Sequence, residues 1–299
     1  MSVRPVKEII RPKPTLEGAG VRLQRGFGFG NTTEFDPFLL FDDFRNDNPS
    51  DFLAGFPWHP HRGIETITYV LTGTVEHGDS LGNRGSLGAG DIQWMTAGSG
   101  IMHQEMPKGD QQGRMHGFQL WANLPASLKM TKPRYQDVPA KDVAEVTDDD
   151  GTMVRIVCGE FWGKKGPVEG VAADPRYLDI SLPPRTRRHI PVESSRHAFA
   201  YVFAGSGKFR DASEPQAVRN ELKDGEYDLA NRSLVLFDSG DEIVVESGDE
   251  GLRFLLVSGQ PIEEPVAWYG PIVMNTQAEL RQAMRELQLG TFIRETQQP

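Results

Sequence analysis

Two pairs of potential metal ligands stand roughly forty residues apart in the chain. His59 and His61 lie in "GFPWHPHRGIETITYVLTG", and His103 and Glu105 lie in "GIMHQEMP". Alternate side chains of a β-strand point to the same face, so each pair should project from one side of its strand. Pro60 lacks an N–H and therefore favours a strand start or an edge strand for the first pair. If the two strands are neighbours, three imidazoles and one carboxylate can meet in one interior.

This ligand set suits Fe(II), Mn, Ni, Cu or Zn. A single histidine is more often a satisfied core residue, but two such pairs beside glycine turns favour a metal site. Closed structural zinc sites usually use cysteine, and Cys158 is the only cysteine of the chain. We therefore expect an open site, with positions left for water, dioxygen or a substrate.

Other polar residues near these segments are weaker candidates. Glu65 shares the parity of His61 and could face the metal or hydrogen-bond a ligand histidine. His77 ends "GTVEH" at a polar turn and is expected to be exposed, and His116 either lines the barrel mouth or begins a strand. His189 and His197 lack a second partner at ligand spacing, so the second half of the chain is expected to hold no metal.

The tryptophans and the cysteine each allow a structural and a functional interpretation. Trp58, Trp94 and Trp121 cluster around the site segments; core packing is the default for each, and a wall for an aromatic ligand is the alternative. Cys158 lies in the apolar run "TMVRIVCGEF" and is expected to be a small buried side chain. A single cysteine excludes an intrachain disulfide and favours a reducing, cytoplasmic compartment.

The elements that must position these residues are short strands. Apolar and polar residues alternate in "TITYVLTGTVEH", "GDIQWMTAG", "HGFQLWANL", "RYLDISLP" and "HAFAYVFAGSGKF", which indicates an antiparallel sandwich or barrel. The segment from Thr68, "TYVLTGTVEH", resembles "AYVFAGSGKF" from Ala200, so two copies of one β unit are expected in tandem. The polar segment "PRYQDVPAKDVAEVTDDDGT" is interpreted as the connector, ending in a hairpin turn at residues 149–151.

One helix is expected, near the C-terminus. In "MNTQAELRQAMRELQLGTF", Thr276 can cap the helix together with Glu279, and Gly290 should end it. The residues Leu280, Ala283, Met284 and Leu287 share one face, which suggests packing on a sheet edge.

Composition excludes some classes of function. The chain has 299 residues, enough for two domains, and a formal net charge of -10. Direct nucleic-acid binding is disfavoured, because the one basic cluster, "RTRRH" at 185–189, is short and is interpreted as a solvated turn. No apolar run reaches the length of a membrane span, and "MSVRPVKEIIRPKP" has no signal-peptide core, so no membrane partner is expected.

Several long segments resemble the pirin family of the bicupin superfamily. They are "DPFLLFDDF", "HPHRGIETITYVLTG", "GDIQWMTAGSGIMHQEMP", "HGFQLWANLP" and "GPIVMNT". The resemblance implies an all-β fold of two tandem cupin (jelly-roll-like) barrels with a short C-terminal helix. It implies a metal-binding N-terminal barrel in residues 1–136 and a metal-free C-terminal barrel in residues 137–299 that ends in the helix.

The resemblance also implies a ligand set, His59, His61, His103 and Glu105. In cupins generally the carboxylate follows the first histidine pair, which would make Glu65 the ligand. In pirins it comes from the second motif, so Glu65 is expected to support a ligand instead. Gly98 in "AGSG" replaces a proline usual in cupins, and the turn is still expected to form.

Two kinds of function follow from the resemblance. One is quercetin 2,3-dioxygenase activity, in which an Fe(II)-type enzyme cleaves a flavonol or similar enol with O2 and Glu105 acts as general base. The alternative is an iron-binding regulatory protein that acts through protein partners as a transcriptional or metabolic co-regulator. The acidic charge disfavours a nuclear co-regulator, and the open metal site favours chemistry, so we expect the dioxygenase.

Overall fold

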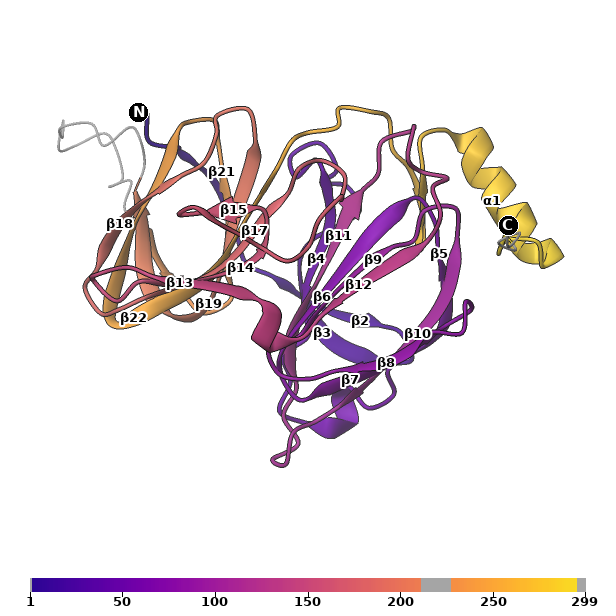
Figure 1. Ribbon diagram of the computed structural model, residues 1–299, viewed down its shortest axis with the longest axis horizontal. Helices are drawn as coiled ribbons and strands as arrows, with labels where there is room; N and C mark the ends of the chain where they lie inside the picture. The colour runs from indigo at the N-terminus through magenta and orange to yellow at the C-terminus, as the bar shows by residue number, and fades with distance from the viewer. Residues whose placement is uncertain (1, 211–226, 295–299) are drawn as a thin grey trace. The chain divides into compact units, whose positions relative to one another are not determined.

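The computed structural model describes residues 2–210 and 227–294 (Figure 1). Strands form nearly all of its regular structure, as expected from the alternating pattern. The chain divides into two units: one holds Lys13–Asp142 and the segment from Ile262 onward, and the other holds Val143–Pro261 and the segment up to Pro12. None of the helices in the described part of the chain has both the length and the apolar character that crossing a bilayer requires.

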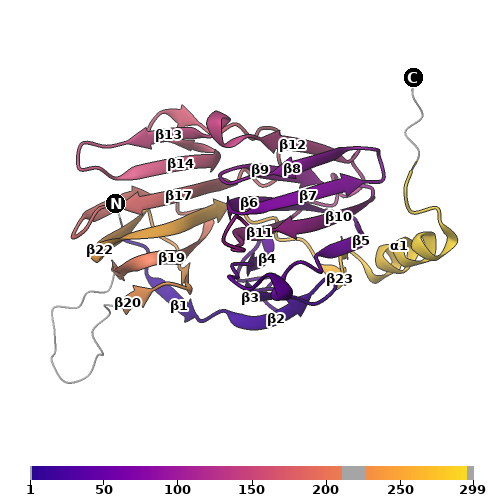
Figure 2. The ribbon, with the colours of Figure 1, turned by 90° about the horizontal axis from the view of Figure 1, so that it is seen from below.

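The first unit is built from two antiparallel sheets. The larger has seven strands, in the order β12 (Arg134–Val138), β9 (Ile92–Thr96), β6 (Ile64–Thr72), β11 (His116–Asn123), β4 (Phe38–Asp43), β3 (Val21–Phe27) and β2 (Lys13–Glu17). The smaller has four strands, in the order β5 (Phe56–His61), β10 (Ile101–Lys108), β7 (Thr74–Asp79) and β8 (Arg84–Leu87) (Figure 2). The 3-10 turns η1 (Pro49–Asp51) and η2 (Ala140–Asp142) lie in loops of this unit.

In strand β10 the alternation of side chains determines which residues face the barrel interior. Its sequence alternates fully buried and half-buried positions, and Ile101, His103 and Glu105 are on the buried side. The hydroxyl of Thr68 on β6 donates to Glu105 over 3.2 Å, so the inner faces of the two sheets point toward each other. The polar members of this alternating set therefore lie inside the barrel.

The second unit has one nine-stranded antiparallel sheet that encloses an apolar core. Its strands are β1 (Val6–Ile10), β21 (Ser233–Phe237), β19 (His197–Arg210), β22 (Glu242–Gly259), β17 (Arg176–Leu182), β14 (Met153–Cys158) and β13 (Ala144–Thr147), with β18 (Arg187–Pro191) on β22 and β20 (Tyr227–Ala230) on β19. A small hairpin joins β15 (Glu160–Phe161) to β16 (Lys164–Lys165). Cys158 is buried, with its thiol against the carbonyl of Val168, which confirms the expectation of a small buried side chain.

The C-terminal helix α1 (Gln277–Leu289) forms as the sequence predicts. Thr276 and Glu279 make a reciprocal capping box, and Gly290 ends the helix in the left-handed conformation. Leu280 and Ala283 are buried against the hairpin β23 (Ala267–Tyr269) and β24 (Ile272–Met274). The helix thus packs within the first unit.

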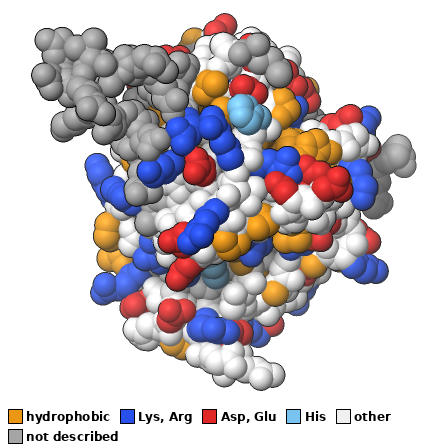
Figure 3. Space-filling model, turned by 90° about the vertical axis from the view of Figure 1, so that its left-hand side faces the viewer, with side chains coloured by type: hydrophobic (Ala, Val, Ile, Leu, Met, Phe, Trp, Pro, Cys, Tyr) orange, Lys and Arg blue, Asp and Glu red, His pale blue; other side chains and the backbone are white. Residues whose placement is uncertain are grey.

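Three features differ from the sequence-based expectations. The expected division at 136/137 lies close to the observed junction after Asp142, but the helix belongs to the first unit and residues up to Pro12 belong to the second. The segment interpreted as a connector contains two strands, β12, which pairs with β9, and β13, which pairs with β14. The predicted hairpin turn at Gly151 does form. In the "RTRRH" segment, residues 187–189 lie in edge strand β18, not in a turn. Acidic and basic side chains are interspersed on the face shown in Figure 3.

Candidate metal centre

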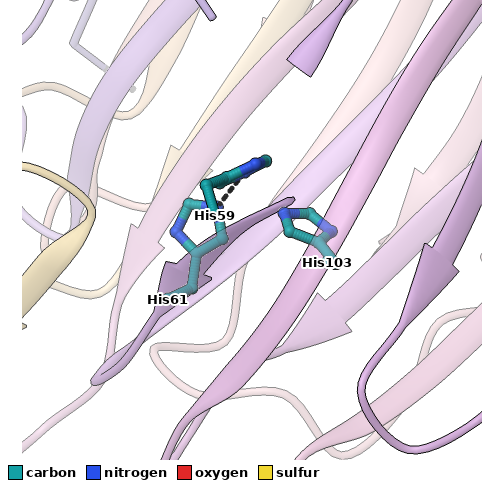
Figure 4. A group of neighbouring side chains, drawn as sticks. All are labelled: His59, His61 and His103. Atoms are coloured by element: carbon teal, nitrogen blue, oxygen red, sulfur yellow. Dashed lines mark hydrogen bonds between the residues drawn. The ribbon is translucent and has the colours of Figure 1, made fainter. Parts of the chain in front are cut away.

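Three imidazoles meet inside the first barrel, as strand parity predicts. His59 and His61 come from β5 and His103 comes from β10, and ligand nitrogen atoms of all three lie within 4.8 Å of one another. The Nε2 atoms of His59 and His61 are 3.1 Å apart. Figure 4 shows the three rings turned toward one another. Such a group is able to bind a metal ion.

The register of β5 and β10 produces this convergence. His103 lies directly opposite His59, and Ile101 lies opposite His61. Strand β5 is an edge of the four-stranded sheet, so Pro60 can lie there without breaking a ladder on both sides, as predicted.

Glu105, the fourth predicted residue, lies beside the three histidines. Its Oε2 is 4.0 Å from Nε2 of His103, and its Oε1 accepts a hydrogen bond from Thr68. The compact group within 4.8 Å contains the histidines and not Glu105. A register shift between His103 and Glu105 displaces the carboxylate along β10 relative to β5. The structure therefore places Glu105 close to His103 but outside the group of three imidazoles.

Burial keeps these imidazoles in the neutral form that a metal requires. Burial, followed by repulsion from His77, lowers the pKa of His103 to about 4. Burial also lowers the pKa of His61 well below its usual value and, with a contribution from His103, lowers that of His59. Neutral imidazole carries the lone pair that binds a cation, so no proton has to be displaced at neutral pH.

The hydrogen bonds within the site leave ring nitrogens that are able to bind a metal ion. The Nδ1–H of His59 donates to the carbonyl of Pro57 over 2.9 Å, which leaves its Nε2 lone pair directed into the cluster. Both ring nitrogens of His103 are buried and lack a hydrogen-bond partner among the described residues. Burying unsatisfied nitrogen is unfavourable, and a cation at the centre of the cluster would remove that cost. The donor set therefore fits a divalent transition metal.

A cavity of about 750 Å³ is lined by His59, His61 and Glu105. Trp121 and Trp268 supply aromatic walls, with ring centroids 6.0 Å apart, and the Trp121 ring stands perpendicular to His61 at 5.1 Å. Trp121 thus follows the ligand-wall alternative, whereas Trp94 is fully buried in the core. Trp58 is 52% exposed and matches neither interpretation.

The expectations for His77 and Glu65 need correction. His77 is buried, because its strand β7 lies inside the four-stranded sheet, and its Nε2 lies 3.0 Å from the side-chain amide of Gln93. Glu65 lies three residues before Thr68 in the same regular strand and therefore points to the opposite face. Its carboxylate accepts a hydrogen bond from Thr96 there, away from the three histidines.

The remaining histidines lie outside the cluster. His116 begins strand β11, with its ring against Phe118, and does not line the cavity. His189 is exposed on β18 beside Glu242, and His197 begins β19 in the second unit.

A row of polar residues across the seven-stranded sheet was not anticipated. Arg25, Asp42, Gln119 and Thr68 lie directly opposite one another on β3, β4, β11 and β6, and Gln93 on β9 continues the row. Directly opposed residues of an antiparallel sheet share a face, so the whole row faces the barrel interior. A local signal was present in "FLLFDDF", "HGFQLWANL" and "GDIQWM", where a polar residue occupies an otherwise apolar strand.

The turn that follows His61 is held firmly. The guanidinium of Arg62 is fully buried and donates to the carbonyls of Ser99 and Phe292 over 2.7 and 2.8 Å. Gly63 has a φ of +77°, and a Cβ there would lie 1.9 Å from the carbonyl oxygen of Val273. Only glycine fits such a position.

The second histidine motif begins with a similar turn. Gly98 has a φ of +49°, which proline cannot adopt, and its carbonyl accepts a hydrogen bond from Gly63 over 2.8 Å. The turn forms without the usual cupin proline, as expected. The starts of β6 and β10 are thereby tied to each other beside the histidines.

Comparisons with known proteins agree with this architecture. The family described as Pirin matches residues 20–122, and the Pirin C-terminal cupin domain matches residues 177–293. The chain is 45% identical to "Pirin-like protein" of Caulobacter vibrioides, over 98% of this chain and 100% of that one. It is 39% identical to "Putative quercetin 2,3-dioxygenase PA3240" of Pseudomonas aeruginosa, over 97% and 98% of the two chains.

Among solved structures, a crystal structure of quercetin 2,3-dioxygenase from Acinetobacter baumannii superposes with a TM-score of 0.83. The two sequences are 28% identical, and the match covers 97% of this chain and 99% of that one. The all-β fold of two cupin domains is therefore confirmed. With two matched domains that together span most of its length, the chain belongs to the pirin family.

Proposed function

We propose that this protein is a metal-dependent dioxygenase that cleaves a flavonol, or a similar enol, with O2. One observation carries the proposal: three neutral imidazoles converge, and two of them, His59 and His61, line a cavity of about 750 Å³ that also has aromatic walls. The likeness to a solved structure titled quercetin 2,3-dioxygenase supports the choice of substrate class.

The residues that would hold the metal are His59, His61, His103 and Glu105. When bound there, a divalent metal such as Fe(II) supplies Lewis acidity that stabilises a deprotonated enol oxygen and favours its reaction with O2. Fe(II) is our choice among the metals that this ligand set suits, because it fits a reducing, cytoplasmic compartment, which a chain with only one cysteine favours.

Glu105 is suited to take the proton of the substrate hydroxyl. Burial raises the pKa of its carboxyl group, while His59 and the hydrogen bond from Thr68 oppose that shift. A carboxylate with a raised pKa is a better base at neutral pH than an exposed one. Thr68 holds Oε1, which leaves Oε2 directed toward the histidines and the entering substrate.

The cavity walls orient a flat substrate. Trp121 and Trp268 provide apolar faces near His61, and the hairpin residues Tyr269 and Pro271 continue that wall. Aromatic contacts of this kind bind a planar ring system without fixing its polar groups. Glu105 and the histidines then select which oxygen of the substrate reacts.

The test is aerobic incubation of iron-loaded protein with quercetin. We expect loss of the flavonol absorbance, with one O2 consumed and one CO released per flavonol cleaved. A Glu105→Gln variant should lose roughly 100-fold in kcat, the usual contribution of a positioned general base, if its metal content is retained.

The matched control is His189→Ala, which removes an exposed histidine of the second unit and should leave turnover unchanged. Fully metal-loaded protein that leaves quercetin intact and releases no CO would contradict the proposal. It would instead support the alternative role, a metal-binding regulator that acts through protein partners.

A further inference from the structure

A row of polar residues extends across the cavity, away from the histidines. Thr68, Gln119, Asp42 and Arg25 form the interior row that crosses β6, β11, β4 and β3, and all four line the cavity. Thr68 contacts Glu105 and so marks the reacting end of the row. Adjacent strands are about 4.8 Å apart, so Asp42, two strands from Thr68, lies about 10 Å from it.

Arg25 and Asp42 make a two-pronged ion pair inside apolar surroundings. The Nε and Nη2 atoms of Arg25 each donate to Asp42 over 2.8 Å, and Asp42 is only 4% exposed. Leu23, Leu40 and Phe44 line the cavity around the pair. Burial raises the pKa of Asp42 to about 6 even though Arg25 opposes the shift, so ionising this carboxylate here is unfavourable.

Such a pair is a poor device for stability. Apolar residues of similar volume often replace a buried ion pair with no loss of stability, because desolvation offsets the attraction between the charges. The pair also lies at a cavity wall, where its polar atoms can reach a ligand. Its presence is therefore better explained by recognition than by folding.

The row retains hydrogen-bonding capacity that faces the cavity. Arg25 uses three of its five N–H donors on Asp42 and Glu17, which leaves two without a partner in the described part of the chain. The side-chain amide of Gln119 lies 2.7 Å from the hydroxyl of Thr68. Because Thr68 donates its single proton to Glu105, the amide of Gln119 donates one N–H to Thr68, and its other N–H and its oxygen remain for a ligand. Asp42 retains free lone pairs on its carboxylate. Donors and acceptors thus stand side by side.

We propose that Arg25, Asp42 and Gln119 form a second subsite that selects enol substrates carrying a neutral hydroxyl group on the ring attached to the enol, away from the reacting oxygen. A hydroxyl group both donates and accepts, so it can pair with Asp42 and with Arg25 or Gln119 at once. Anionic groups are disfavoured, because two carboxylates, Glu17 and Asp42, stand against one guanidinium. This inference rests on the proposed function and adds the substrate feature that the cavity recognises.

The test compares two ligands by binding. Quercetin carries two hydroxyl groups on the phenyl ring attached to its enol, and galangin is the same flavonol without them. Their dissociation constants would be measured without oxygen, from quenching of tryptophan fluorescence in metal-loaded protein. We expect wild-type protein to bind quercetin about 10-fold more tightly than galangin, the effect of one hydrogen bond to a charged group.

The variants remove the subsite in two ways. The double variant Arg25→Met/Asp42→Leu deletes both charges together, so no unpaired buried charge remains, and it should bind the two flavonols equally. Gln119→Met keeps the charges and should reduce the preference about 3-fold. The matched control is Arg253→Met/Asp179→Leu, which removes a similar two-pronged pair from the second unit and should keep the 10-fold preference.

Each outcome decides the inference. Equal binding by wild-type protein, binding of neither flavonol, or a preference that survives in both subsite variants would overturn it. Loss of the preference in those variants but not in the control supports it. Failure of the proposed function has a different signature, since a protein that shows the binding preference but consumes no O2 and releases no CO retains the subsite without the reaction.

Discussion

The two barrels use equivalent strand pairs for different purposes. In the first, edge strand β5 pairs with β10, and in the second, β18 pairs with β22. Strands β5 and β10 direct three imidazoles and a carboxylate inward. Strands β18 and β22 place Ile190, Ile243 and Val245 in an apolar core at the corresponding place. The same fold therefore encloses a cavity in the first barrel and a packed apolar core in the second.

This difference has a cost that falls on the first barrel. Each large apolar side chain buried in the second barrel stabilises the fold by about 1.5–3 kcal/mol. The first barrel instead keeps a cavity of about 750 Å³ and buries polar groups such as Asp42 and Glu105. Burying such groups costs free energy, which partners such as Arg25 for Asp42 and Thr68 for Glu105 offset only in part. We infer that the first barrel owes its stability mainly to contacts outside its cavity.

The largest effect is expected from His103→Ala. The variant removes one of three converging imidazoles, and even partners outside the coordination shell change metal affinity 10- to 100-fold. We expect a loss of roughly 1000-fold, or about 4 kcal/mol, measured by competition with a chromophoric chelator. His189→Ala, an exposed histidine of the second barrel, should bind metal as the wild type does. Comparable losses in both variants would remove the distinction between the barrels.

Cavity formation should distinguish a packed interior from an open one. Leu256 is 1% exposed in the core of the second barrel, whereas Leu40 is 5% exposed but lines the cavity of the first. Leu256→Ala should lower the free energy of unfolding by about 3 kcal/mol, because it creates a void. Leu40→Ala only enlarges an existing space and should lower it by about 1 kcal/mol. Urea titration measures both, and equal losses would contradict the comparison.

Much of this contrast is visible in the chain itself. The period of two in "HPH" and "HQE" is local, so parity alone placed His59 with His61 on one face and His103 with Glu105 on another. Capping by Thr276 and Glu279 is equally local and was correctly predicted. The similarity of "TYVLTGTVEH" and "AYVFAGSGKF" also predicted two β units, because such a strand pattern can be recognised from about ten consecutive residues.

Features that depend on distant residues were missed. The interior polar row joins Arg25, Asp42, Gln119 and Thr68 through register, and register between separate strands is not written in any one segment. His77 ends a polar stretch, yet its strand lies within a sheet and is buried. Periodicity describes one strand at a time, so it cannot show which polar positions will meet.

Arg62→Met should test whether the C-terminal segment belongs to the first barrel. Its buried guanidinium binds the carbonyls of Ser99 and Phe292 and pairs with Glu286 of helix α1 at 2.7 Å. Losing the donor for two buried carbonyls should lower the free energy of unfolding by about 2–3 kcal/mol and expose the segment to protease.

The control for Arg62 is Arg285→Met on the same helix. Arg285 is exposed and bonds only Gln282 among the described residues, so the change should be below about 0.5 kcal/mol. If both variants had the same protease resistance as the wild type, the helix would not be fastened through Arg62.

The smallest effect concerns the pH dependence contributed by Lys129. Lys129 is 2% exposed, and its side-chain nitrogen donates to the carbonyl of Gly63 and the side chain of Asn123 over 2.8 and 2.7 Å. Burial lowers its pKa to about 7, while an unfolded lysine titrates near 10.4. Above pH 7 the unfolded chain therefore binds one more proton than the folded chain, so stability relative to Lys129→Met should rise with pH.

Between pH 6.5 and 8.5 that difference should grow by about 2 kcal/mol, because each pH unit contributes up to about 1.4 kcal/mol. Urea titrations of wild-type protein and Lys129→Met at several pH values measure it. Lys141→Met, which removes an exposed lysine in η2, should change with pH in parallel with the wild type. A constant difference between wild type and Lys129→Met would mean that Lys129 stays charged in the fold. The turn after His61 would then accommodate a charged ammonium group. Water would reach Lys129 more readily than the burial of its side chain implies.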